Sequence, residues 1–441
     1  MPELADSPDD TIDLDVTDVA HGGVFVGRHE GRVVFVLDTL PGERVRVRLT
    51  DVGKASFWRG EVVEVLDASP HRRPHIWRQA DVDVPPRDRP GGADFGHIDL
   101  GHQRHLKERV VTDALRRMGG VDLPVTVAPV NGSDDGTGWR TRLSLHVDAD
   151  GRVGPYAARS HRVVTVEDHP LAVPAVARAA RELSAGEPGR IDLVQPADGA
   201  VRVLRRPETA RRGAGGADRR RRPRPTGAKP APTREVVLER AGGRDFRVDV
   251  GGFWQVHHAA ADALTETVTQ HIRAAHPEGL DPDAVHLDLY GGVGLFAAAL
   301  GDLGGPATRV ISVESDARAT EHAGENLSEW VGARAETGRV DRWLAQWSDQ
   351  ASPRERERVS RGVVVLDPPR SGAGREVVQA LAALGPQTVV YVACDPVALA
   401  RDVATFRDAG YAASRIDALD LFPHSHHVEA VATLIREEPR R

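Results

Sequence analysis

The sequence predicts an α/β protein whose C-terminal part is a doubly wound, mostly parallel sheet, preceded by a small β-barrel and a central α+β domain. Two patterns carry this prediction. From about residue 283, β-rich runs alternate with helical stretches, whereas residues 11–67 hold short alternating strands and glycine-rich turns. With 441 residues, 40% of them hydrophobic, the chain can bury a large core and form two or three domains.

The barrel is predicted over residues 11–67. Residues 22–52 and 57–68 contain short strands of alternating hydrophobicity, and glycines mark the turns between them. This pattern suits a small barrel of the oligonucleotide-binding (OB) type.

The central domain is predicted over residues 68–256. It contains a helix candidate from Gln103 to Met118 and a hairpin over residues 141–158 with a turn at its middle. Residues 205–235 interrupt it with a segment rich in arginine, proline and glycine. Because this segment has almost no large apolar residues to bury, we expect a disordered loop.

The sheet is predicted over residues 257–441. Its β-rich runs are residues 284–290, 308–315, 362–369 and 387–394, and the helical stretches between and after them are residues 295–303, 316–330, 374–384 and 397–406. Such alternation is typical of parallel strands. The last two runs, residues 411–422 and 428–437, have no helix between them, so we expect an antiparallel pair at the end of the sheet.

Composition excludes several classes of protein. The first residues, "MPELADSPDD", are acidic where a signal peptide is basic, and no apolar run reaches membrane-spanning length, so we expect a cytoplasmic protein without membrane contact. One cysteine cannot form an internal disulfide or a cysteine-rich metal site. The formal net charge of −7 argues against a uniformly basic protein. A monomer is the default expectation.

Ligands of such sheets bind beyond the carboxyl ends of the strands, so the residues that follow each strand are the candidate site. After the first run, "DLYGGVGLF" places Gly292 and Gly294 where the backbone can turn tightly and approach a ligand. Glu314 follows the second run, twenty residues after Gly294, where an acid bonds ribose hydroxyls. Together these residues predict an adenosine-containing cofactor; a glycine turn used only for helix packing is the alternative.

The third run ends in "VVVLDPPRSG". Asp367 closes the strand, and the two prolines stop it and stiffen the loop. With the glycine loop and Glu314 upstream, this segment resembles the fourth motif of class I S-adenosylmethionine (SAM) methyltransferases. Arg370 stands where enzymes of that class acting on exocyclic amines usually have an aromatic residue.

The fourth run leads into the only cysteine, in "VVYVACDPVALARD". Asp395 is predicted to cap the following helix and Pro396 to occupy its first turn. Cys394 would then lie against a helix N-terminus, which favours thiolate over thiol, although the Asp395 carboxylate opposes this effect. A buried, inert cysteine is the alternative.

A thiolate beside SAM has a specific use. Carbon 5 of a pyrimidine is a weak nucleophile, but addition of a thiolate at carbon 6 makes it able to attack a methyl sulfonium. A base must then remove the carbon 5 proton. The segment "LFPHSHHVEAV" offers Glu429 for this step, with three histidines nearby.

The ordered motifs "DLYGGVG", "DPPRSG", "YVACDPVALARD" and "FPHSHHVE" closely resemble those of the RNA uridine-C5 methyltransferases, which form 5-methyluridine in transfer and ribosomal RNA. The resemblance implies Cys394 as nucleophile and Glu429 as base. It implies that Tyr290, Glu314 and Asp367 lie near the cofactor or target base, and that Gln255 in "GGFWQVH" contributes to the SAM site. Arg370 is expected to contact RNA or substrate.

The resemblance also implies a TRAM domain, which binds RNA, at the position of the barrel; a barrel used only for packing is the alternative. Some members carry four cysteines for an iron–sulfur cluster before the catalytic domain, whereas here "GGADFGHIDLGHQRH" has none, so we expect no cluster. Ala393 and Asp395 replace the usual serine and asparagine beside the nucleophile, and Leu295 replaces a frequent asparagine.

The histidines of "FPHSHHVE" raise the question of a metal site. His426 and His427 are adjacent, so on a strand they would point to opposite faces, and we expect no metal there. His427 matches a histidine of the family and is expected to orient Glu429 or its loop.

The predicted function is SAM-dependent formation of 5-methyluridine in ribosomal or transfer RNA; the sequence does not separate these two substrates. The arginine-rich segment 205–235 is expected to hold RNA phosphates, with a functionless insertion as the alternative. Two other classes remain open. A nicotinamide-dependent oxidoreductase leaves Cys394 without a role, and a catalytically silent RNA-binding protein explains the barrel alone. Cytosine methylation usually places its cysteine in or beside the proline motif, which here has none.

Overall fold

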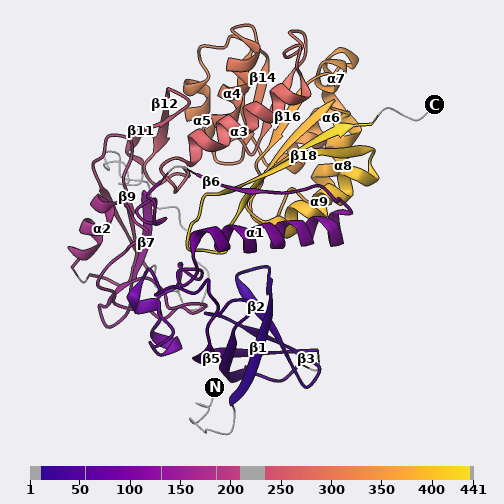
Figure 1. The fold of residues 1–441 in the computed structure, drawn as a ribbon. Helices are drawn as coiled ribbons and strands as arrows, with labels where there is room; N and C mark the ends of the chain where they lie inside the picture. Colours follow the sequence, from indigo (N-terminus) through magenta and orange to yellow (C-terminus); the bar gives the residue numbers. More distant parts are fainter. Residues whose placement is uncertain (1–10, 55, 131, 185, 209–233, 438–441) are drawn as a thin grey trace, which may run out of the picture.

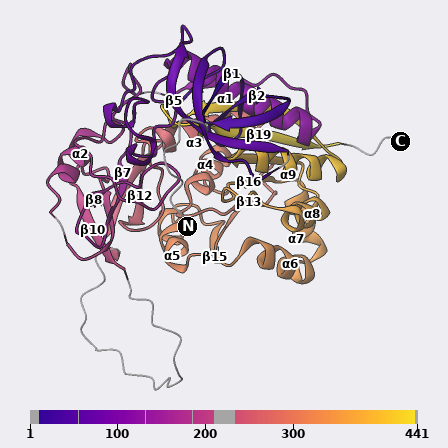
Figure 2. The ribbon, with the colours of Figure 1, turned by 90° about the horizontal axis from the view of Figure 1, so that it is seen from below.

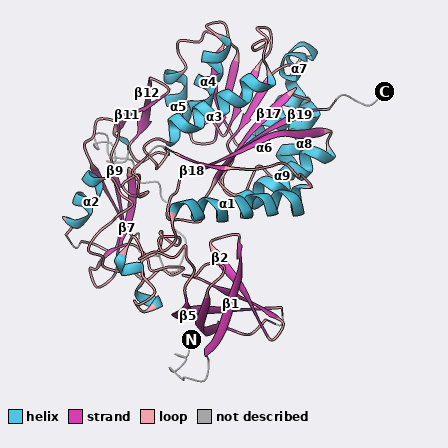
Figure 3. Ribbon diagram, viewed as in Figure 1, coloured by secondary structure: helices cyan, strands magenta, loops and turns pink. Residues whose placement is uncertain are grey.

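The computed structural model describes residues 11–54, 56–130, 132–184, 186–208 and 234–437. The chain has three parts: an N-terminal barrel, a central antiparallel sheet and a large sheet covered by helices on both faces (Figures 1 and 3). Within the described ranges, no helix is long and apolar enough to cross a membrane.

The predicted barrel is confirmed. Five strands close in the order β1-β2-β3-β5-β4. They are β1 (Thr11–Ala20), β2 (Val24–His29), β3 (Arg32–Val36), β4 (Arg44–Asp51) and β5 (Phe57–Asp67). Their alternating residues fill one core, in which Phe25, Val34 and Val47 are fully buried. Closure leaves the barrel without an open edge.

The central region contains a four-stranded sheet in the order β10-β9-β7-β8 and a separate hairpin. The elements are β7 (Arg142–Val147), β8 (Val153–Gly154), α2 (Pro174–Arg181), β9 (Gly189–Val194), β10 (Arg202–Pro207), and the hairpin β11 (Val236–Ala241) and β12 (Arg244–Asp249). The predicted 141–158 hairpin is present as β7 and β8. Residues 205–207 belong to β10, so the predicted insertion begins too early; residues 209–233 lie outside the described residues.

The large sheet has the order β15-β14-β13-β16-β17-β19-β18-β6. Its strands are β6 (Val127–Pro129), β13 (His286–Leu289), β14 (Val310–Glu314), β15 (Ala333–Thr337), β16 (Val363–Leu366), β17 (Thr388–Ala393), β18 (Tyr411–Asp420) and β19 (Glu429–Arg436). The strands β13 to β17 pair in parallel, and β18 and β19 form the predicted antiparallel pair. This pair is not the end of the sheet, because β6 adds in parallel beyond β18.

Helices bury both faces of this sheet. They are α1 (Leu100–Ala114), α3 (Ala260–Ala275), α4 (Leu295–Gly304), α5 (Ala317–Asn326), α6 (Val340–Gln350), α7 (Pro353–Ser360), α8 (Arg375–Leu384) and α9 (Pro396–Asp408). Successive residues of β16 face opposite clusters: Val363 packs with α3 and α4, whereas Val364 packs with α8 and α9. Burial on both faces explains why the central strands are continuously apolar.

Helix α1 connects the barrel to the sheet. The predicted helix at 103–118 is observed as α1 followed by a π-helical turn, Leu115–Gly119. Leu106 packs into the barrel core, whereas Val111 and Leu115 pack into the core beneath the large sheet. Figures 1 and 2 accordingly show α1 between the barrel and the sheet. Two elements of the central region thus belong to the C-terminal unit: α1 packs on the large sheet, and β6 extends it.

Candidate active site

The parallel strands bring the predicted residues to one edge. Leu289 pairs with Val313 on one side and with Leu366 on the other, so the residues that follow these strands are neighbours. The backbone N–H of Asp367 donates to the Leu289 carbonyl at 3.2 Å, and that of Gly291 donates to Val313 at 3.0 Å. These bonds fix the glycine loop against the strand ends on either side.

Cys394 and Glu429 lie opposite each other across two antiparallel strands. Ala393, the last residue of β17, pairs with Ala430, the second residue of β19. Continuing this register by one step pairs Cys394 with Glu429. Residues that face each other in such ladders have Cα atoms about 5 Å apart. Because β19 runs against its parallel neighbours, its first residue lies at the same sheet edge as their last residues.

The environment of Cys394 differs in part from the prediction. As predicted, Asp395 caps α9: its side chain accepts from the backbone N–H groups of Val397 and Ala398, and Pro396 opens the helix. The predicted shift toward thiolate is not found. The pKa of the half-buried Cys394 thiol is raised to about 11, mainly by burial and also by the Glu429 carboxylate, while Arg370 acts in the opposite direction. Desolvation of the sulfur is therefore the largest effect on the pKa of this thiol.

Three carboxyls lie at this edge, of which Asp288 and Glu429 are buried and Asp367 is partly exposed, and desolvation is the main reason that each binds its proton more tightly than usual. Burial raises the pKa of Glu429 well above its ordinary value, and Asp367 adds to this. Burial raises the pKa of Asp367 to about 7, as it does for Asp288. Asp288 is anchored by the backbone of Ala297 at 3.1 Å. For Asp367 and Glu429, no side-chain hydrogen bond is found among the described residues, which is typical of groups that act on a ligand.

The glycine loop has an unusual backbone. Tyr290 is a non-glycine residue with a φ of 64°, and Gly292 and Gly294 have φ values of 56° and 92°. Non-glycine residues rarely adopt this conformation, and they do so most often at functional sites. A side chain at Gly292 would meet no atom within 4 Å, so the loop backbone is open toward the pocket, while its N–H donates to Glu314 at 3.2 Å.

One large pocket joins almost all predicted site residues. It is lined by Gln255, Tyr290, Gly292, Glu314, Asp367, Arg370, Cys394, His427 and Glu429. Gly294 is not among the lining residues; it is the residue before α4. Leu295 also lines the pocket. The glycine loop and Glu314 thus share a cavity with the thiol and the buried carboxyls.

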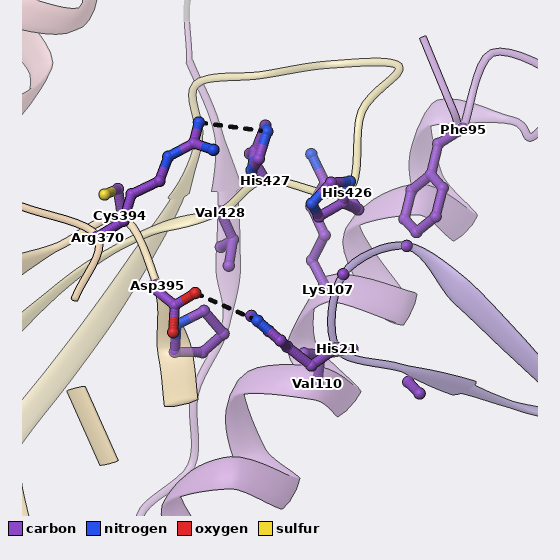
Figure 4. A pocket seen from close by; sticks show the side chains of 14 residues that line it. His21, Phe95, Lys107, Val110, Arg370, Cys394, Asp395, His426, His427 and Val428 are labelled. Carbon is purple, nitrogen blue, oxygen red and sulfur yellow. Dashed lines mark hydrogen bonds and ion pairs between the residues drawn. The ribbon is translucent and has the colours of Figure 1, made fainter. Parts of the chain in front are cut away.

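The histidine-rich segment is a loop, which corrects the expectation of a strand there, because β19 begins only at Glu429. The histidines have different partners. His424 binds the Asp135 carbonyl at 2.7 Å, and His426 binds the Asp94 carboxylate at 2.5 Å. His427 lies 3.5 Å from an Arg370 nitrogen, and no bond from it to Glu429 is found in the described structure. It therefore lies beside Arg370 (Figure 4).

Arg140 was not predicted, although it lines the same pocket. Burial lowers the pKa of Arg140 to about 10, and the nearby Arg370 adds to this effect. Among the described residues, neither arginine has a carboxylate within salt-bridge distance. Arg140 is partly exposed and lies over the Trp139 ring at 4.8 Å, so its charge is available to a negative or polar ligand in the pocket. Its signal in the sequence was only an arginine after Trp139, which is not specific.

The "LARD" segment holds the proline loop in place. Asp402 on α9 accepts hydrogen bonds from the backbone N–H groups of Ala373, at 2.7 Å, and Gly374, at 3.2 Å. The hydroxyl of Tyr391 donates to the same carboxylate oxygen at 2.7 Å. The helix that begins after Cys394 therefore fixes the loop that follows Asp367.

Comparison with known proteins agrees with this geometry. The model of the TRAM domain matches residues 9–63, and the model of the tRNA (uracil-5-)-methyltransferase family matches residues 356–437. An uncharacterized RNA methyltransferase of Streptomyces avermitilis is 37% identical over 96% of this chain and 97% of its own length. One from Streptomyces coelicolor is 38% identical over 96% of this chain and 92% of its length.

A solved structure shares the whole architecture. The tRNA (uracil-54, C5)-methyltransferase of Pyrococcus abyssi, in complex with S-adenosyl-L-homocysteine, matches with a TM-score of 0.65 and 21% identity. The match covers 96% of this chain and 100% of that one. At this identity the likeness concerns the fold.

The sheet, the glycine loop and the pocket at the carboxyl edge define a class I SAM-dependent methyltransferase. Given the near full-length relatives and the matched family models, the chain belongs to the SAM-dependent RNA (uracil-5) methyltransferase family. Family membership removes the nicotinamide-dependent alternative.

Proposed function

We propose that this protein transfers a methyl group from SAM to carbon 5 of a uridine in structured RNA, through a transient bond between Cys394 Sγ and carbon 6. The observation that carries the proposal is the β17–β19 register, which sets a thiol opposite a buried carboxyl in one pocket. In this mechanism the thiol and the carboxyl must both reach the same uracil ring, and the register places them close enough to do so.

The residues present fit SAM. Glu314 offers a carboxylate for ribose hydroxyls at the second strand end, and the open backbone at Gly292 allows a ligand to approach. Gln255 and Asp367 line the same cavity as further polar contacts. When bound, SAM supplies an electrophilic methyl group on a positively charged sulfur.

The chain's own residues provide the remaining chemistry. The Cys394 thiol gives its proton to solvent water, and the thiolate adds to carbon 6 of the uracil ring, which makes carbon 5 the nucleophile. After carbon 5 is methylated, Glu429, as carboxylate, takes its proton, and the electron pair expels the Cys394 thiolate. Arg140 and Arg370 have no carboxylate partner in the described ranges of the chain, so both cations are suited to the uracil oxygens or a neighbouring phosphate.

The RNA is expected to present the uridine flipped out of its stack, because carbon 6 must reach a thiol at the bottom of a pocket. The structural relative from Pyrococcus abyssi is named for uracil 54 of tRNA, so unmodified tRNA is the first substrate to test and ribosomal RNA the second. SAM and both RNAs are available in the cytoplasm, where we place the protein, acting as a monomer.

The test is nucleoside mass spectrometry after incubation of the protein with methyl-labelled SAM and separate pools of unmodified tRNA and ribosomal RNA. Label in 5-methyluridine from one pool would identify the substrate class. Cys394→Ala should abolish turnover while SAM still binds, because the sulfur does not hold the cofactor. Methylation by this variant would refute the covalent route, and absence of label with the unaltered protein would favour a silent RNA-binding protein.

A further inference from the structure

A second, smaller pocket lies between the barrel and Cys394 (Figure 4). One wall is the β1–β2 turn of the barrel, with His21, Gly22 and Gly23, and the other is the start of α9. Other titratable or charged side chains around it are Lys107, Arg370, Cys394, His426 and His427. Cys394 therefore lines both this pocket and the large one.

His21 and Asp395 join the two walls. The ring nitrogen Nε2 of His21 lies 3.2 Å from Oδ2 of Asp395, and the side chains are 45% and 22% exposed. The other oxygen, Oδ1, accepts from Val397 at 3.0 Å and Ala398 at 2.8 Å. One carboxylate thus caps the helix that follows Cys394 and holds the barrel at the same time.

The bond favours charge on both partners. The hydrogen bond to Asp395 raises the pKa of His21. Burial acts against the ionised form of Asp395, but the hydrogen bonds from His21 and from the helix N–H groups lower its pKa overall. An asparagine, usual at position 395 in the family that the sequence resembles, would cap the helix but carry no charge for His21. Asp395 can therefore form an ion pair with a protonated His21, which an asparagine could not do.

The turn that carries His21 is held closely from other sides. A Cβ placed on Gly23, which has a φ of 70°, would lie 2.6 Å from the Asp94 carboxylate and 2.8 Å from the His426 Cβ. Arg159 of the central region donates to the Gly22 carbonyl at 3.2 Å. The β1–β2 turn is therefore packed closely against its neighbours, and His21 is the residue through which it contacts Asp395, next to Cys394.

We propose that His21 is a positioning residue for methyl transfer: through Asp395 it fixes the start of α9, and with it Cys394, to the barrel. This inference rests on the proposed function, because it assigns His21 to that reaction. The barrel then does more than bind RNA, since its docking completes the loop that holds the nucleophile.

The first experiment separates positioning from binding. Single-turnover methylation and the RNA dissociation constant are measured for His21→Ala, His21→Gln, Asp395→Asn and the double variant His21→Ala/Asp395→Asn. We expect His21→Ala to slow methyl transfer on the order of tenfold, as misplacement of a reacting group does, with RNA affinity little changed. His21→Gln, whose amide can donate to Asp395, should recover part of the rate.

The double variant decides whether the two residues act as one unit. If they do, its rate equals that of the slower single variant. Multiplied losses would show independent effects and overturn the proposal. Weaker RNA binding with an unchanged rate in the bound complex would likewise overturn it, since His21 would then be an RNA contact only.

A second readout needs no methylation. Because Cys394 is the only thiol, its alkylation by iodoacetamide reports directly on the loop. At one fixed pH, we expect alkylation to be severalfold faster in His21→Ala and Asp395→Asn. The matched control is His71→Ala. The His71 side chain is 46% exposed and lies 2.9 Å from the Asp99 carboxylate, and neither residue lines this pocket. An unchanged rate in His21→Ala would contradict the proposal, even if the unaltered protein methylated no RNA tested.

Discussion

At the scale of single residues, the site is a set of ionisable groups whose charged forms are disfavoured. Cys394, Asp367 and Glu429 all bind their protons more tightly than usual, mainly because they are buried. A ligand that brings polar groups or positive charge into this site would stabilise the ionised carboxyls. Arg140 and Arg370 face the same pocket and balance part of the negative charge when the carboxyls ionise.

Glu429→Gln tests the base and its burial together. Turnover should slow strongly and a protein–RNA adduct should accumulate, because the carbon 5 proton has no acceptor. The adduct is measured as a denaturation-resistant band in gel electrophoresis. Normal turnover would show that another group takes the proton. Glu437→Gln, at an exposed glutamate just after β19, is the control and should change neither result.

The same variant has a pH-dependent effect on stability. Above its raised pKa, Glu429 is ionised in both folded and unfolded chains, and burial of that charge destabilises the fold. Glutamine removes this cost, so the melting temperature should rise by about 2 °C or more at alkaline pH. The gain should shrink as the pH falls through the raised pKa and vanish below the unfolded value. A gain that grew with acidity would contradict this explanation.

The sequence could predict most of the site because its residues follow strands whose ends share one edge. Cys394 and Glu429 were predicted from their motifs, and topology alone made them neighbours. The net effect on the thiol could not be predicted, since burial depends on distant packing. Arg140 was missed for the same reason, because its approach to the pocket is a tertiary feature.

At the scale of elements, strands with continuous apolar runs were predicted well, whereas β15, α6 and α7 were missed. The strand β15 is an edge strand of five residues, none fully buried, and therefore lacks an apolar run. The three-residue strand β6 is too short to give a pattern. Pairing with β18, almost 300 residues later, makes it a strand.

Helix α9 supports two catalytic loops, and Asp402 is the residue that tests this. Asp402→Ala should leave the Gly374 N–H and the Tyr391 hydroxyl proton without their acceptor, at about 1–3 kcal/mol for each group left unpaired, whereas the Ala373 N–H keeps the Tyr391 hydroxyl oxygen at 3.0 Å. The loop after Asp367 should loosen, so SAM affinity should fall. Calorimetric SAM titration and urea unfolding measure the two effects.

Its control lies on the same helix. Asp408→Ala removes an exposed carboxylate whose ion pair, in the part of the chain that the structure describes, is with the adjacent Arg407, and it should leave both measurements unchanged. Tyr391→Phe should show a smaller loss than Asp402→Ala, because only one of the three donors is removed. Unchanged SAM binding in Asp402→Ala would contradict the prediction, because it would show that the position of this loop does not affect SAM affinity.

At the scale of the whole molecule, a fully buried ion pair ties the central region to the catalytic sheet. Lys107 on α1 lies 2.5 Å from Asp420 at the end of β18 and also donates to the Phe422 carbonyl at 3.0 Å. Lys107→Met should lower the free energy of unfolding by about 3–5 kcal/mol, because Asp420 is left as an unpaired buried charge. Urea unfolding measures the loss.

Two comparisons make this prediction specific. Lys54→Met changes the charge equally at an exposed barrel residue and should have little effect. The double variant Lys107→Met/Asp420→Leu should recover much of the stability, because no unpaired charge remains. A similar loss in the double variant would mean that shape, and not charge, dominates there. The pair was not predictable, since the partners are 313 residues apart.

The arginine-rich segment 209–233 lies outside the described residues, but both of its ends can be placed. Arg206 before it and Arg234 after it line the large pocket. Deleting residues 209–233 should weaken RNA binding at low salt and flatten its salt dependence, because fewer phosphate contacts release fewer counterions. Binding is measured by fluorescence anisotropy from about 50 to 200 mM salt, a range over which affinity that depends on several phosphate contacts falls steeply. Equal affinity and slope would show that the segment does not hold RNA.

The register between β17 and β19 has a consequence for how genes of this kind can diverge. Nucleophile and base are locked together by a ladder with a period of two, so a single codon gained or lost within either strand would turn one group away from its partner. Length changes can instead accumulate in the connections outside this ladder. Related sequences should therefore conserve the number of residues from Thr388 to Cys394 and from Glu429 to Ile435 more strictly than the number of residues between these two segments.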